Sequence, residues 1–245
     1  MTAPFPTRRQ EEWRYADLEA LEPLWEQFSE PVTLTVGPGE EAEEIWLPAS
    51  ADVHLRRVHI ALGQGAKARI FALNNAPLYG RLELEVSLED KAEFELFGAN
   101  IGTGLSTNEI ITTVRHIGVG GRSRQIVRSV LNAKATGSYL GKVKVAKGAQ
   151  QTDAEQSVKA MLLDRGATAN CKPELEIFAD DVKCAHGATV GELDAMQLFY
   201  AETRGLDPAS ARALLLEAFV MGLWDSAASP DTICAAAREA LRRVA

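Results

Sequence analysis

Apolar and polar residues alternate through the middle of the chain. From about residue 31 to residue 190, the sequence consists mainly of short segments in which every second residue is apolar. A period of two is typical of β-strands, because successive side chains of a strand point to opposite faces. The alternation predicts a mainly β core with strands at residues 32–36, 54–62, 68–73, 82–88, 93–98, 109–117, 124–131, 139–146, 157–163 and 174–179.

Corners made of small residues separate the predicted strands. Most contain a glycine, a small residue and then a polar or small one. A recurring corner between short strands favours a solenoid, in which each coil buries its inward face against its neighbours. A two-sheet sandwich also has short alternating strands, and the pattern leaves both folds open. The corners are expected at residues 63–68, 118–123, 146–151, 164–169 and 185–190.

Helical spacing replaces the alternation at both ends of the chain. Residues 8–28 carry apolar residues at helical intervals, interrupted at Pro23, and predict a short helical lead-in. After Gly191 the spacing is helical again. The expected organisation is therefore a helical lead-in, a β core and a C-terminal helical region, at residues 1–30, 31–190 and 191–245.

Three helices are expected in the C-terminal region. The first covers residues 194–204, and the others begin at the Asp-Pro pair 207–208 and the Ser-Pro pair 229–230, which are typical of helix N-termini. The middle helix is too apolar for an ordinary surface helix. It would either pack onto the end of the β core or form a docking surface for another protein. Its apolar residues are Leu214, Leu215, Leu216, Phe219, Val220, Met221, Leu223 and Trp224.

The composition narrows the classes of partner. The net charge is −8 at pH 7, which opposes binding to nucleic acid and to anionic membrane surfaces, so neither is expected as a partner. The first residues show no signal-peptide pattern, and no run reaches the roughly 18 apolar residues of a spanning helix. The three cysteines lack C-x-x-C spacing, which favours free thiols in a reducing compartment. A cytoplasmic protein is expected.

The segment 172–191 contains the most suggestive chemistry. If it is extended, Cys184 and His186 lie two residues apart and point to the same face of a strand. A thiolate and an imidazole form half of a site for zinc, iron or an iron-sulfur cluster, and the other ligands would come from elsewhere, such as another chain. On the residues alone, a small buried cysteine beside a hydrogen-bonded histidine is the favoured interpretation.

Other candidate residues have less functional weight. His54 and His59 lie five apart and face opposite sides of a predicted strand, so a shared metal would require a bulge. His116 ends a predicted strand, and Cys171 and Cys234 are expected in packing roles.

Enzyme signatures are missing from the sequence. It contains no phosphate-binding loop, no G-x-S-x-G elbow and no H-E-x-x-H zinc motif. The acidic residues between positions 83 and 95 alternate with apolar ones, as on the solvated side of strands. Because β-solenoids also host carbohydrate-active enzymes, a hydrolase or lyase is the alternative function, which predicts paired carboxylates in a cleft.

Three segments together resemble the SufB/SufD family of iron-sulfur cluster assembly proteins. They are EEWRYADL at 11–18, KPELEIFADDVKCAHGATVG at 172–191 and LFYAETRGLDPASARALLLEAFV at 198–220. The segment SVKAMLL at 157–163 has no cysteine where SufB-like proteins tend to carry one, which favours the SufD branch. The resemblance implies a right-handed parallel β-helix core and so favours the solenoid over the sandwich.

The resemblance also implies a non-catalytic scaffold that works with partner proteins. The β-helix ends would pair with SufB, or with a second copy in a SufD homodimer. His186 matches the family's interface histidine, with Cys184 beside it, so a transient iron-sulfur cluster or iron is expected at the SufB interface and none bound stably to the isolated chain. The ATPase SufC would dock on the C-terminal helices, through Leu198, Phe199, Leu214, Leu215 and Phe219.

Overall fold

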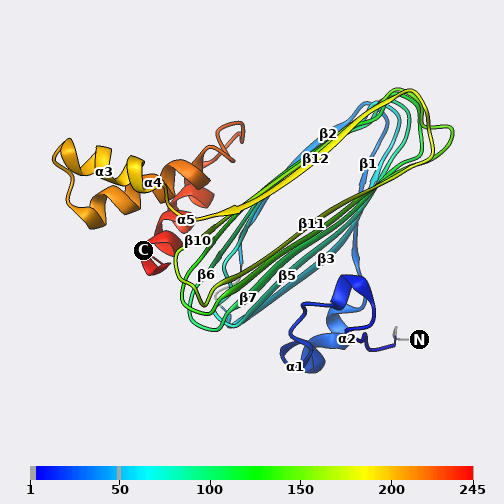
Figure 1. Ribbon diagram of the computed structural model, residues 1–245. Helices are drawn as coiled ribbons and strands as arrows, with labels where there is room; N and C mark the ends of the chain where they lie inside the picture. Colours follow the sequence, from blue (N-terminus) through cyan, green and yellow to red (C-terminus); the bar gives the residue numbers. More distant parts are fainter. Residues whose placement is uncertain (1–3, 49–50, 245) are drawn as a thin grey trace.

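Two parallel sheets form the body of the protein. The computed structural model describes residues 4–48 and 51–244. The chain passes back and forth between the sheets, so that each strand pairs in parallel with the strand two positions further along (Figure 1). This arrangement is a parallel β-helix. It confirms the predicted fold class and excludes the sandwich.

We call the two sheets the odd sheet and the even sheet, after the numbers of their strands. The odd sheet contains β1 (Val32–Val36), β3 (Val53–Leu62), β5 (Tyr79–Leu88), β7 (Thr107–His116), β9 (Thr136–Val145) and β11 (Thr168–Ile177). The even sheet contains β2 (Glu41–Trp46), β4 (Lys67–Asn74), β6 (Glu93–Gly102), β8 (Arg122–Leu131), β10 (Thr152–Leu162) and β12 (Val182–Gly191).

The strands differ from the sequence prediction in two places. β2 was not predicted, because three glutamates within six residues hide its alternation. Residues 185–190 were predicted as a corner and instead lie inside β12, where pairing with β10 keeps the backbone extended. The other predicted strands are all observed, with ends that differ by up to six residues; the largest difference is at the start of β11, which was predicted at residue 174 and lies at Thr168.

In-register stacking of inward side chains builds the core. Because neighbouring strands are parallel and in register, each inward residue lies directly over one in the preceding coil. Burying an aliphatic side chain of this kind stabilises the fold by about 1.5–3 kcal/mol. One such row of the odd sheet consists of Ile60, Val86, Val114, Val143 and Leu175.

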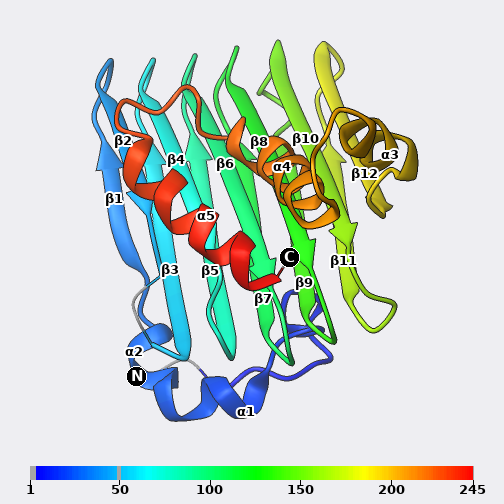
Figure 2. The ribbon, with the colours of Figure 1, turned by 90° about the vertical axis from the view of Figure 1, so that its left-hand side faces the viewer.

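Three helices follow the β-helix: α3 (Ala195–Thr203), α4 (Pro208–Met221) and α5 (Asp231–Val244). Asp207 caps α4, as predicted, by accepting hydrogen bonds from backbone N–H groups. Asp194, which was predicted as the first residue of the helix, caps α3 in the same way. Figure 2 shows α5 lying across the outer face of the even sheet. None of the described helices has the length and apolar content needed to cross a membrane.

The apolar segment of α4 packs on a face of the β-helix and not on its end, which corrects one of the two explanations from sequence. Leu216 and Val220 are buried in a cluster with Phe71 and Phe97 from the outer side of the even sheet. In the following turn, the indole N–H of Trp224 donates to the Phe97 carbonyl at 3.1 Å. The helical region is therefore anchored to the middle coils.

The helical lead-in lies against the odd sheet. It comprises α1 (Leu18–Leu21), α2 (Trp25–Phe28) and two short 3₁₀ turns (Glu11–Trp13 and Glu22–Leu24). Trp13, Leu21 and Phe28 are buried with Tyr79 of β5. Pro23 lies in the second 3₁₀ turn and divides α1 from α2, as expected for a residue that has no N–H to donate.

Candidate functional site

The last coil of the β-helix has an uncovered end. β11 and β12 are the final strands of their sheets, and each pairs on one side only within the described part of the chain. Figure 2 shows β12 at the far end of the row of strands, beside α3. Residues 185–191 of β12 are all exposed. This end therefore presents an accessible inward face and an unpaired backbone edge.

Cys184 and His186 lie on the inward face of β12. Val182 and Cys184 are half-buried and pack against the core, and His186 follows on the same side of the strand. His186 is exposed because β12 is the last strand of its sheet. The structure therefore brings these two residues together on one face, as the spacing predicts.

Burial decides the state of the thiols near this end. It raises the pKa of the Cys184 thiol, and a hydrogen bond with the Ala154 backbone opposes the shift. Burial also raises the pKa of the Cys171 thiol, which points inward from β11 and packs against the core. Both are free cysteines, and in the ranges 4–48 and 51–244 no group of three or more His, Cys, Asp or Glu side chains is arranged to hold a metal ion. Burial therefore favours the protonated form of both thiols.

A polar row leads from the interior to His186. In the even sheet, His186 pairs in register with Gln156, and Gln156 pairs with Gln125. Both glutamines are buried. Gln125 Oε1 accepts the hydroxyl of Thr112 at 2.6 Å and that of Tyr139 at 3.0 Å. Sequence reasoning missed this row, because its members lie about 30 residues apart and only the register of the coils aligns them.

The other three histidines lie away from the uncovered end of the β-helix, and their contacts are with neighbouring side chains of the fold. His116 is buried, and its Nε2 lies 2.9 Å from the Ser123 hydroxyl; burial lowers the pKa of His116 to about 4. His59 Nε2 lies 3.5 Å from Glu85 on the outer face of the odd sheet. His54 points to the opposite side of β3, as the odd spacing predicts, and burial lowers its pKa, with a smaller effect of the Arg56 charge.

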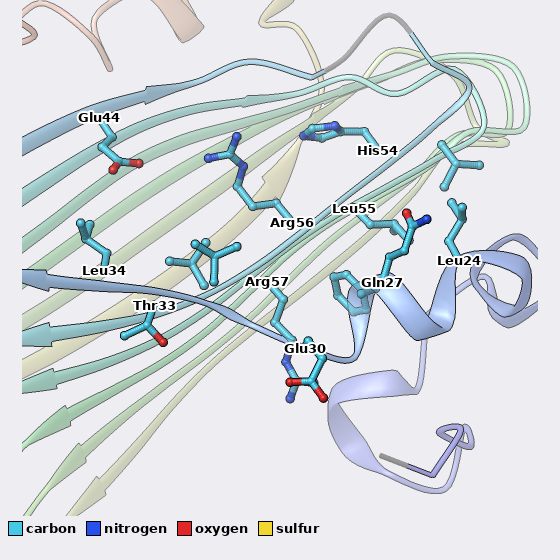
Figure 3. Close-up of a pocket in the computed structure, with 14 residues that line it drawn as sticks. Leu24, Gln27, Glu30, Thr33, Leu34, Glu44, His54, Leu55, Arg56 and Arg57 are labelled. Carbon is cyan, nitrogen blue, oxygen red and sulfur yellow. The ribbon is translucent and has the colours of Figure 1, made fainter. Parts of the chain in front are cut away.

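A cavity of about 810 Å³ lies at the other end of the β-helix. It is lined by residues of β1, β2 and β3 and by α2 (Figure 3). Leu24 and Gln27 reach it from the helical side, and His54 and Arg56 from β3. It is separated from His186 by the whole stack of coils.

Exposed apolar side chains gather on the C-terminal helices. Of the residues predicted to dock a partner, Phe199 and Leu214 are exposed, whereas Leu198, Leu215 and Phe219 are half-buried. Phe219 also packs against the cluster under α4. The sequence prediction missed three exposed apolar residues, although two of them repeat at helical spacing with Phe199: Met196, Tyr200 and Leu206.

These features define a class of protein. The protein is a solenoid with an accessible coil end and with C-terminal helices that expose apolar side chains. The family model described as SUF system FeS cluster assembly, SufBD core domain, matches residues 44–219, which is more than half of the chain. The chain belongs to the SufBD family, and this confirms the resemblance predicted from the sequence.

Several known proteins are similar to the chain. An iron-sulfur cluster assembly SufBD family protein of Synechocystis is 32% identical over 173 residues, which cover 70% of this chain and 38% of that protein. The iron-sulfur cluster assembly protein SufD of Escherichia coli is 38% identical over 104 residues, 42% of this chain and 25% of SufD. Protein ABCI7 of Arabidopsis chloroplasts is 43% identical over 100 residues, 40% of this chain and 21% of ABCI7. The matched segment is thus well under half of each relative.

Proposed function

We propose that the chain is a non-catalytic scaffold subunit for iron-sulfur cluster assembly. It pairs with SufB at the end formed by β11 and β12, and it binds the ATPase SufC through its C-terminal helices. The nascent cluster is cargo that forms at the SufB interface beside His186. The observation that carries the proposal is the exposure of His186 on an inward strand face, because its equivalents in the four preceding coils are buried.

The edge of β12 suits a partner that is itself a β-structure. An exposed edge presents unpaired N–H and C=O groups, and another chain can continue the sheet by pairing with them. A partner coil in this position would cover the face that carries Cys184 and His186 and remove it from water. A neutral imidazole in such a place supplies one ligand to iron, and thiolates of the partner would supply others.

The helical region suits a second partner. Figure 1 shows α3 projecting away from the β-helix. Met196, Phe199 and Tyr200 on α3 and Leu214 on α4 are each more than half exposed. Apolar side chains left in water in this number favour an interface. We assign this surface to SufC, which would carry out the ATP hydrolysis of the complex.

The alternative function, a carbohydrate-active enzyme, has weaker support. Two of the acidic residues between positions 83 and 95 are engaged by arginines: Glu83 lies 2.9 Å from Arg57, and Glu85 lies 2.8 Å from Arg115. Carboxylates that are neutralised in this way are poorly placed to exchange protons with a substrate.

Size-exclusion chromatography of the chain mixed with SufB and SufC tests the proposal. A complex that contains all three proteins is expected. Ala188→Arg adds a long charged side chain to the inward face of β12 and should abolish pairing with SufB. Thr189→Arg places the same side chain on the opposite face of the same exposed strand and should leave the complex intact. Elution of the wild-type chain alone or as a homodimer, in the presence of both proteins, would contradict the proposal.

A further inference from the structure

Gln156 has an unusual position directly beneath His186. It lies in β10 and is 1% exposed, and its partner in the register of β12 is His186. Neither Oε1 nor Nε2 of its carboxamide has a hydrogen-bond partner among the described residues. A buried amide without partners is costly, and in a folded protein it calls for an explanation.

The preceding coil shows what Gln156 lacks. Gln125 occupies the same row one coil earlier, and its Oε1 accepts the Tyr139 hydroxyl from the facing odd sheet. In the next coil the residue in register with Tyr139 is Cys171. The cysteine side chain is too short to bring a donor across the interior as tyrosine does. Gln156 Oε1 therefore lacks the donor that Gln125 Oε1 has, whereas Nε2 is without a partner in both glutamines within the described part of the chain.

The next polar side chain in the row is His186. Neighbouring strands lie about 4.8 Å apart, so side chains at paired positions are within reach of each other. The terminal torsions of Gln and His are broad, and the exposed His186 ring is free to turn toward the amide. No other residue of β12 on this face can donate a hydrogen bond at that position, because Ala188 follows His186 and Cys184 lies over Ala154.

We propose that Gln156 is a positioning residue for His186. Its Oε1 accepts the N–H of the ring nitrogen that faces the interior, which leaves the other nitrogen unprotonated and directed to the uncovered end. A hydrogen bond behind a ligand histidine fixes the tautomer and the ring orientation in this way. The inference rests on the proposed function, because it supplies the form of His186 that a metal at the SufB interface needs.

The tautomer of His186 can be measured in the chain alone. The protein has four histidines, so nitrogen-15 NMR of histidine-labelled protein resolves each ring, and His186→Ala assigns the signals. One tautomer should dominate in the wild type. Gln156→Leu should change the tautomer ratio about threefold or more, as expected for the loss of one hydrogen bond. Gln125→Leu, the same change in the same row one coil further away, should leave the ratio unchanged.

Equal ratios in the wild type and in Gln156→Leu would overturn the proposal. If Gln156→Leu does not fold, Gln156→Met keeps the unbranched shape, and a nuclear Overhauser effect between the Gln156 amide and the His186 ring in the wild type tests the contact without any variant. The measurement needs neither SufB, SufC nor iron. A fixed tautomer in a chain that forms no complex would therefore reject the proposed function alone.

Discussion

Nη1 of Arg81 lies 3.1 Å from Oε2 of Glu109, and both side chains are completely buried. Tyr79 donates to the same carboxylate oxygen at 2.8 Å. Arg81 also donates to the Glu12 carbonyl, and its guanidinium lies 3.7 Å from the centre of the Trp13 ring. Arg81 therefore joins the helical lead-in to the β-helix.

Arg81→Met should lower the free energy of unfolding by about 3–5 kcal/mol, because it leaves the buried Glu109 carboxylate without its counter-charge. Urea denaturation followed by circular dichroism measures the change. Arg115→Met is the matched control. Arg115 also binds a carboxylate from the odd sheet, at 2.8 Å, but its side chain is 41% exposed, so a loss of less than about 1 kcal/mol is expected. Similar losses in the two variants would contradict the assigned role of Arg81.

His116 should make the fold sensitive to acid. Burial lowers its pKa from 6.5 to about 4, so the unfolded chain binds a proton near pH 6.5 that the folded protein does not accept. Stability present at pH 7 is therefore lost progressively as the pH falls from about 6.5 to about 4, and the loss from this residue levels off below that. The total loss of unfolding free energy from His116 is about 3 kcal/mol.

Urea denaturation between pH 7 and pH 4 measures this contribution as a difference between the wild type and His116→Gln. Carboxylates add their own loss in acid, but they are common to both proteins. The variant should lose less stability than the wild type over the range. Parallel curves would show that His116 is not the group responsible.

The exposed and buried apolar residues of the helical region should behave differently. Phe199→Ser removes a side chain that is 60% exposed, so it should leave the melting temperature nearly unchanged and weaken co-purification with SufC. Leu216→Ala opens a cavity under α4 and should cost about 2–5 kcal/mol of stability. If Phe199→Ser destabilised the fold as strongly as Leu216→Ala, the surface would be part of the core and not a docking site.

Most of the fold could be predicted from the sequence, because the strands and helices of this β-helix have short-range sequence patterns. Alternation placed the strands, and the Asp207–Pro208 pair placed the start of α4. β2 was not predicted, because the alternation of apolar and polar residues is weak among its glutamates. Its strand conformation comes from pairing with β4. The corner predicted at 185–190 failed for the same reason, since pairing with β10 overrides the local preference of Gly187 for a turn.

Only one part of the candidate site, the pair Cys184 and His186, could be predicted from the sequence. The spacing of Cys184 and His186 was enough to place both on one face. The row that joins His186 to Gln156 and Gln125 depends on the length of each coil and corner, which sets the register. Such long-range alignments are consequences of the folded stack and have no local signal.

Anaerobic cluster reconstitution on the complex with SufB and SufC tests the central claim most directly. Wild type, His186→Ala and His59→Ala would be compared by visible absorbance, with His59 as a histidine of the outer face. The account predicts that the wild type and both variants form the complex with SufB and SufC. The wild type and His59→Ala should support a cluster, and His186→Ala should not. A cluster of undiminished absorbance on the His186→Ala complex would contradict the account.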